Sequence, residues 1–277
     1  SSAAPLAEPA GSQPEALLFE LSDATAPGPL HAAVLACLVP QHSVAEIQAW
    51  RRAVRDHTAD ERLLEAVQSL PPRRRLPWFE RLLRLAAALP APKRAALVRD
   101  AQAVAQADGR LSLAEYLEGS VLRHQLGVHG ERLSAERRSL TLAELAQPVA
   151  VVSRALATAL TGELRAGWLQ SVSAGLRLPP AGERPMPSGG ELAAALDRLA
   201  LLGRMERPAL VKQWIAGQPL AGWPQGAYDA LRCLCLLIDT PLPPTLAAQF
   251  DPLPLLPEAD HPAPPPLSNE RVAAFHA

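Results

Sequence analysis

The sequence predicts an all-α protein made of antiparallel bundles of short helices. It is rich in Ala, Leu, Arg and Glu, only 4% of its 277 residues are aromatic, and no segment alternates apolar and polar residues as a half-buried strand would. Hydrophobic residues make up 48% of the chain, which is enough to bury a sizeable core. We therefore expect essentially no sheet.

Helix starts are marked by capping boxes, in which Ser or Thr is followed three residues later by Glu. The hydroxyl accepts a hydrogen bond from the third amide, and the carboxylate accepts one from the cap amide. Prolines and glycines between the boxes predict where helices end. The predicted boxes are Ser43 with Glu46, Thr58 with Glu61, Ser112 with Glu115, Thr141 with Glu144, and Ser188 with Glu191.

Two apolar stripes predict a pair of helices packed on each other. One runs from Trp78 to Leu89 and the other from Leu97 to Ala105, each with apolar residues at helical spacing. Four of the five tryptophans lie in helical patterns and are expected to be core anchors. These are Trp50, Trp78, Trp168 and Trp214.

The chain divides into two helical halves with tails. Residues 1–28 are rich in Pro, Ala, Gly and Ser, and residues 251–277 are rich in Pro, so we assign both to linkers or tails. Residues 29–130 form the first half. Residues 131–250 form the second, which we interpret as a degenerate repeat because 207–212 resembles 94–99 at an offset of 113. At this offset Ala221 and Tyr228 replace Asp108 and Glu115.

The charge balance and the cysteine content limit the classes of partner and the cellular compartment that we expect. The 27 basic and 28 acidic side chains nearly cancel, so nothing indicates a nucleic-acid partner. The three cysteines, Cys37, Cys233 and Cys235, fit a reducing compartment, and we expect a cytoplasmic location. No apolar run reaches the roughly 18 residues that a membrane-spanning helix needs.

The strongest candidate for a metal site is the acidic turn from Asp108 to Glu115. Asp-Gly followed by five residues and Glu matches the second half of a calcium-binding EF-hand loop. The first half is missing, because Val104 and Gln106 stand where further ligands belong. The alternative, which we favour, is structural: Gly109 permits a left-handed turn, Asp108 accepts from turn amides, and Glu115 completes a capping box.

Two further features are candidates for interaction. Arg73, Arg74 and Arg75 form a basic cluster that would meet lipid phosphates or a partner, unless it is simply a solvated face. Trp223 lies in a turn before Pro224 and would cap a groove between the halves, unless it belongs to the core.

The histidines and cysteines offer no recognisable site. A zinc peptidase needs H-E-x-x-H, and none of the seven histidines stands in it. We interpret all of them as surface or capping residues: His31, His42, His57, His124, His129, His261 and His276. Cys233 and Cys235 are two residues apart and do not form a redox or zinc pair.

Several short motifs resemble a known family. Residues 76–79, 108–116, 122–124, 231–232 and 240–244 are similar to the C-terminal region of bacterial membrane zinc metallopeptidases of the HtpX and CAAX-protease type, which itself resembles the helical TerB fold. The resemblance spans roughly residues 30–250. It implies a longer parent protein with membrane helices and an H-E-x-x-H domain before residue 1, so that zinc is expected only in that domain and no cofactor in this segment.

The resemblance also implies a function. This chain would be a non-catalytic accessory or regulatory domain on the cytoplasmic side of the inner membrane. It would act by contact with its own catalytic domain or another protein, and it would meet the membrane only through the parent. The alternative is a TerB-like stress-response protein that binds a metal ion at Asp108 and Glu115. A third possibility is a stand-alone enzyme whose active site matches no motif.

Overall fold

A computed structural model describes residues 13–23, 26–41, 43–57, 61–127, 139–177 and 186–253. Within these ranges the chain is helical, and the one extended pairing is an isolated bridge between Leu140 and Leu202. The predicted all-α class is confirmed. None of the described helices is long and apolar enough to cross a membrane.

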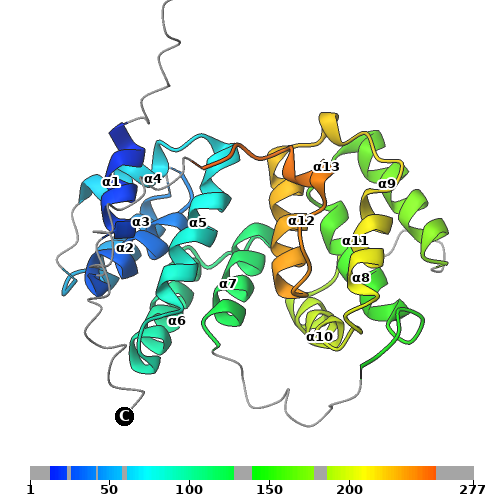
Figure 1. The fold of residues 1–277 in the computed structure, drawn as a ribbon, viewed down its shortest axis with the longest axis horizontal. Helices are drawn as coiled ribbons and strands as arrows, with labels where there is room; N and C mark the ends of the chain where they lie inside the picture. Colours follow the sequence, from blue (N-terminus) through cyan, green and yellow to red (C-terminus); the bar gives the residue numbers. More distant parts are fainter. Residues whose placement is uncertain are drawn as a thin grey trace, which may run out of the picture.

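The helices form two groups that lie side by side, with α7 and α12 between them (Figure 1). The first group is α1 (Gln13–Asp23), α2 (Pro27–Cys37), α3 (Val44–Ala53), α4 (Glu61–Gln68), α5 (Pro72–Ala86), α6 (Ala91–Ala105) and α7 (Leu113–Gln125). The second is α8 (Ala146–Ala157), α9 (Gly162–Gly175), α10 (Gly189–Leu199), α11 (Arg207–Ile215), α12 (Gln225–Leu237) and α13 (Pro244–Ala247).

Local sequence explains most helix starts. Ser112 and Ser188 form complete capping boxes with Glu115 and Glu191. Five helices, α2, α5, α6, α11 and α13, begin with proline in their first two positions, where the missing amide hydrogen costs nothing.

The other predicted boxes differ from expectation. Ser43 precedes α3 without a side-chain cap bond. Thr141 and Glu144 make the reciprocal bonds, but they close a turn ahead of α8 rather than the helix itself. Thr58 lies outside the described residues.

Helix α2 is the centre of the first group. It is buried along nearly its whole length and packs against α4, α5 and α6. The sequence predicted that the two apolar stripes, on α5 and α6, pack on each other, but both pack mainly on α2 instead. The reason is that α2 is apolar on all sides and so has no single buried face.

The predicted N-terminal linker contains a packed helix. In α1 the side chain of Leu18 is buried, and buried Glu15 accepts hydrogen bonds from Arg74 of α5. Helix α1 also packs along α4. The sequence predicted a linker here because the Pro- and Gly-rich residues on both sides of this helix are typical of a linker. The helix itself offers only one short apolar patch.

The tryptophans confirm the prediction of core anchors. Trp168 of α9 donates to the backbone carbonyl of Trp214 at 2.8 Å, and Trp214 of α11 donates to Ser153 of α8 at 2.9 Å. Three helices of the second group are thereby joined by indole hydrogen bonds. In the first group Trp50 donates to the carbonyl of Ala32 at 3.0 Å. These three buried indoles thus have a partner for their one polar atom, whereas the Nε1 of buried Trp223 has none among the described residues.

Equivalent positions recur in the two groups. At an offset of 113, buried residues of α5 and α6 fall on buried residues of α10 and α11: Phe79 on Leu192, Leu82 on Ala195, Ala86 on Leu199, Leu97 on Leu210 and Ala101 on Trp214. Pairings recur too, since α2 packs on α5 as α8 packs on α10, and α3 packs on α6 as α9 packs on α11.

The register changes by one residue at the last helix of each group. Helix α7 starts at residue 113 and α12 at residue 225, an offset of 112. Both are followed two residues later by a left-handed residue, Gly127 at φ 65° and Asp239 at φ 48°. At the offset of 112, Tyr228 is therefore the equivalent of Tyr116 and not of Glu115. Gly222 is not left-handed, unlike Gly109, so the acidic turn has no structural counterpart in the second group.

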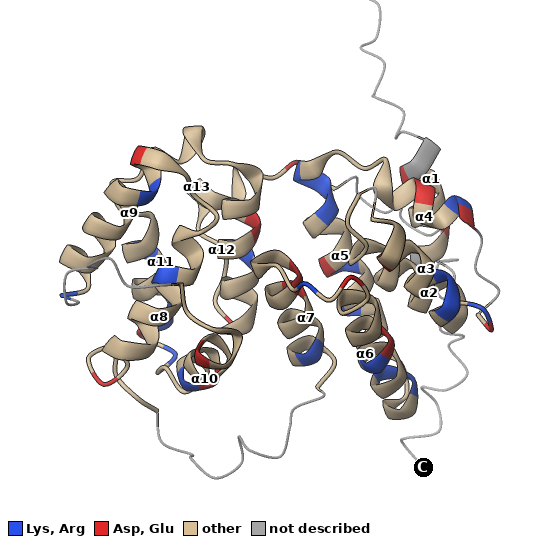
Figure 2. Ribbon diagram, turned by 180° about the vertical axis from the view of Figure 1, so that it is seen from behind, with Lys and Arg blue, Asp and Glu red and all other residues tan. Residues whose placement is uncertain are grey.

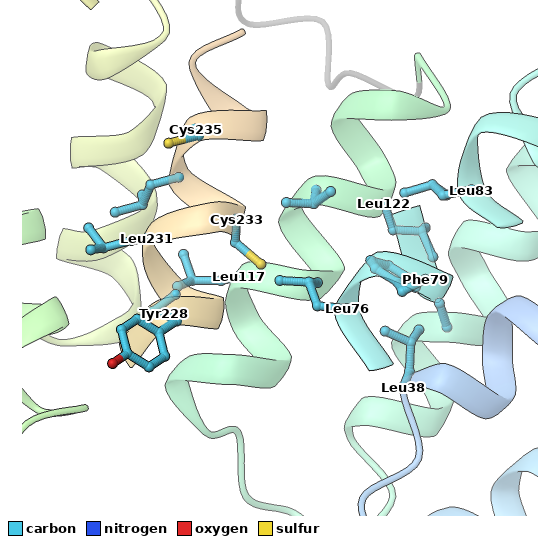
Figure 3. Packing of buried hydrophobic residues seen from close by; sticks show 14 of the residues in the cluster. Leu38, Leu76, Phe79, Leu83, Leu117, Leu122, Tyr228, Leu231, Cys233 and Cys235 are labelled. Carbon is cyan, nitrogen blue, oxygen red and sulfur yellow. The ribbon is translucent and has the colours of Figure 1, made fainter. Parts of the chain in front are cut away.

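The two groups meet where α7 packs along α12. Figure 3 shows buried Leu117 of α7 at this boundary, near Tyr228 and Cys233 of α12. An ion pair crosses the junction as well: Arg232 of α12 binds Glu80 of α5, and both side chains are largely buried.

Candidate functional site

A cleft of about 370 Å³ opens at the junction of the two groups. It is bounded by the end of α2 and by α5, α7 and α12, so residues from both groups line it. Figure 2 shows the basic start of α5 at this junction. Its apolar walls include Leu38, Leu76 and Phe79, and its polar residues include Arg75, Glu118 and Asp229. Pockets between structural units are where binding sites most often occur.

Two carboxyl groups in the cleft are poorly solvated. Burial raises the pKa of Glu118 on α7 to about 8, and the negative charge of Asp229 raises it further, while Arg75 opposes the shift. Burial likewise raises the pKa of Asp229 on α12 to about 6, against the effects of Gln225 and two arginines. The charged forms of both groups are therefore only partly compensated, which is a common property of functional sites.

Arg75 supplies a donor to the same cleft. Its Nη2 donates to the carbonyl of Val39 at 3.1 Å, while its buried Nε has no hydrogen-bond partner among the described residues. Cys37 also lines the cleft, but burial raises the pKa of its thiol to about 12. That thiol is protonated at neutral pH and is a poor nucleophile.

No protein-family model, curated protein or solved structure matches this chain. The resemblance to metallopeptidase tails and to TerB therefore stays a prediction from the short motifs.

The arginine cluster does not act as one surface. Arg73 donates to the carbonyls of Gln249 and Ala248, at 2.8 and 3.0 Å, and thereby holds the end of α13. Arg74 pairs with buried Glu15. Because the three neighbours bind in three directions, only Arg75 remains a candidate for contact with a ligand.

Trp223 belongs to the core of the second group. Its side chain is 6% exposed and its ring contacts those of Trp168 and Tyr228, with centroids 6.4 and 6.2 Å away. All three residues lie in the second group. The idea that Trp223 caps a groove between the halves is therefore wrong, because its aromatic surface is used within one half.

The carboxylates of the acidic turn accept hydrogen bonds from backbone amides of the same turn. Asp108 accepts from the amide of Arg110 at 2.7 Å, and Glu115 accepts from the amide of Ser112 at 2.6 Å. Gly109 has the left-handed φ of 73° that the structural interpretation requires. Glu46 of α3 is near this turn, because Asp108 and Glu115 add to the burial that raises the pKa of Glu46.

Two histidines treated as unremarkable in the sequence come together. His31 of α2 is buried, its ring stacks on that of His57, and its Nε2 lies 3.0 Å from Asp100. Burial, and then the neighbouring His57, lower the pKa of His31, while Asp100 opposes the shift. His124 pairs separately with Asp239 at 2.8 Å. The predicted surface role is thus wrong for His31. His42, His129, His261 and His276 lie outside the described residues.

Sequence reasoning missed Glu118 and Asp229. The available signal for Glu118 was its position four residues after Ala114 and four before Leu122, on the apolar face of the helix. An acidic side chain on such a face is unusual, because Glu is rarely buried without a partner. Nothing local connects it to Asp229, which is more than a hundred residues away.

We predict that Glu118 makes the protein less stable as pH rises. The folded state keeps the proton of Glu118 up to about pH 8, whereas the unfolded chain releases it near 4.5, so unfolding becomes easier between these values. Glu118→Gln should reduce this decline and raise the unfolding midpoint at about pH 8.5 by a few degrees, since 1 kcal/mol is worth about 2–4 °C.

Thermal unfolding followed by circular dichroism at several pH values measures this effect. The control is Glu163→Gln, which changes an exposed glutamate of α9 and should follow the wild type. A Glu118→Gln midpoint that equals or falls below the wild-type midpoint at high pH would show that the carboxyl is adequately solvated.

Proposed function

We propose that this chain is a non-catalytic accessory module that binds a polypeptide segment in the central cleft. The observation that carries the proposal is that a buried donor without a partner and two carboxyl groups with raised pKa values line the same cleft. Among the described residues Arg75 Nε is a buried donor without a hydrogen-bond partner. Glu118 and Asp229 are acceptors whose charged forms are poorly solvated, although Asp229 accepts one hydrogen bond from Gln225. A peptide unit offers one donor and one acceptor, and so complements both.

The cleft favours a segment with a basic side chain between apolar ones. Leu38, Leu76 and Phe79 supply apolar walls. A lysine or arginine entering beside Glu118 and Asp229 would favour the ionised form of each carboxyl and offset its burial. Arg75 already lies in the cleft, yet the pKa values of both acids remain raised, so negative charge there is not fully compensated.

We further propose, from the sequence resemblance, that the parent is a membrane-bound zinc metallopeptidase. The bound segment would then belong to its own catalytic domain or to another protein, on the cytoplasmic side of the inner membrane. The motif at 108–116 and the all-α architecture support this assignment. The open reading frame upstream of residue 1 should encode membrane spans and H-E-x-x-H; a frame without them would contradict the parentage, but not the peptide site.

We predict selective binding of short peptides in which a central arginine or lysine is flanked by leucines. Fluorescence anisotropy of labelled peptides measures the affinity, and matched peptides carry Gln or Glu at the centre. The basic peptides should bind at least about tenfold more tightly than the acidic one, because only they compensate the cleft carboxyls.

The double variant Glu118→Gln, Asp229→Asn should lose this preference, and Glu163→Gln should keep it. Circular dichroism checks that the variants are folded. Equal affinity for basic and acidic peptides, or a preference that survives in the double variant, would contradict the proposed site.

The alternative function, metal binding at Asp108 and Glu115, has one supporting observation. Buried Glu46 lies near this turn, and its Oε2 has no hydrogen-bond partner among the described residues. The proposal has weaker support than the cleft, since Asp108 and Glu115 each already accept from a backbone amide.

Calcium or magnesium should raise the unfolding midpoint if this alternative holds, because a ligand selective for the folded state stabilises it. The rise should disappear in Asp108→Asn combined with Glu115→Gln. An unchanged wild-type midpoint with either ion would leave the turn a purely structural element.

A further inference from the structure

We propose that His31, His57 and Asp100 form a binding site for a divalent transition-metal ion such as Zn²⁺. The three residues come from separate segments: His31 from α2, His57 from the turn after α3, and Asp100 from α6. One possible ligand atom from each lies within 4.8 Å of the others. Two imidazoles and a carboxylate are a donor set that suits zinc and its neighbours.

The geometry is close to that of a coordinated ion. Zinc lies about 2.0–2.2 Å from nitrogen and carboxylate oxygen, so two ligands of a tetrahedral ion are about 3.3 Å apart. His31 Nε2 and Asp100 Oδ2 are 3.0 Å apart. The rings of His31 and His57 stack with centroids 4.3 Å apart and planes 21° apart, which places their nitrogens close together. Binding one ion would draw the three ligand atoms together from within 4.8 Å and rotate one ring out of the stack, so that both lone pairs point at the ion.

Surrounding contacts hold the ligands in place. Gly28 at the start of α2 approaches the turn that carries His57 so closely that a Cβ there would lie 2.8 Å from the His57 carbonyl oxygen. Arg99 Nε lies 3.6 Å from Asp100 Oδ1, the oxygen that does not face His31. The close approach of Gly28 fixes the backbone that carries His57, whereas exposed Arg99 makes only a loose ion pair with Asp100.

The site is reachable from solvent. His31 is 2% exposed, whereas Asp100 is 22% exposed and His57 is half-buried. An ion can therefore enter from the side of His57 and Asp100, and a water molecule can complete four-coordination. The bound ion would join α2, α6 and the turn after α3, which are held together mainly by apolar packing.

The test is a zinc titration of the full chain after removal of metals with EDTA. At about pH 7.5 imidazole is largely neutral, and competition with a chromophoric zinc chelator gives the affinity and the stoichiometry. We expect one Zn²⁺ per chain. His57→Ala and Asp100→Asn should each weaken binding at least about tenfold. Cobalt bound in place of zinc should give the visible bands of a tetrahedral site.

The matched control is His124→Ala, which removes a histidine–aspartate pair that has no second histidine beside it in the part of the chain that the structure describes. It should leave zinc binding unchanged. His57→Ala and Asp100→Asn are used because their partly exposed side chains are less critical to the core than His31, and circular dichroism checks their folding. No binding by the wild type, or equal affinity in the wild type and both ligand variants, would overturn the proposal.

Discussion

The packing of α7 against α12 joins the two helical groups and creates the cleft between them. Each helix closes its own group: α7 contacts α6, and α12 follows the turn that carries Trp223. Along their shared boundary they present apolar side chains such as Leu117 and Cys233 (Figure 3). The ion pair between Arg232 and Glu80 reinforces the junction, and Arg232 also stacks over Phe250 with 4.4 Å between guanidinium and ring. Arg73 and Arg232 thereby bring the segment around α13 back onto the junction.

The same interface accounts for the chemistry of the cleft. Glu118 and Asp229 lie on the two helices that meet, so the packing that buries Leu117 also reduces the contact of both carboxyls with water. Burial without full compensation costs stability, and a fold optimised only for stability would avoid it. The cost is understandable if a ligand supplies the missing partners. The His31 cluster, formed by residues of α2, α6 and the turn after α3, is a separate feature of the first group, and its role does not depend on the cleft.

The sequence predicts local structure better than it predicts the site. Composition, capping boxes at Ser112 and Ser188, and prolines at helix starts specify helices through contacts within a few residues. Helix α1 was missed because its flanks resemble a linker. The meeting of Glu118 with Asp229, or of His31 with Asp100, depends on tertiary packing between distant helices. No local spacing encodes that packing, and the offset between the two groups even shifts from 113 to 112 on entering the final helices.

Differential scanning calorimetry of the intact chain tests most directly whether the α7–α12 interface unites the two groups. The account predicts one transition with equal calorimetric and van't Hoff enthalpies. Leu117→Ala should move that whole transition down, by a loss of about 2–5 kcal/mol typical of a buried leucine. Two separate transitions in the wild type, with only one of them shifted by Leu117→Ala, would show that the groups unfold independently and that the cleft is not a built feature of a single unit.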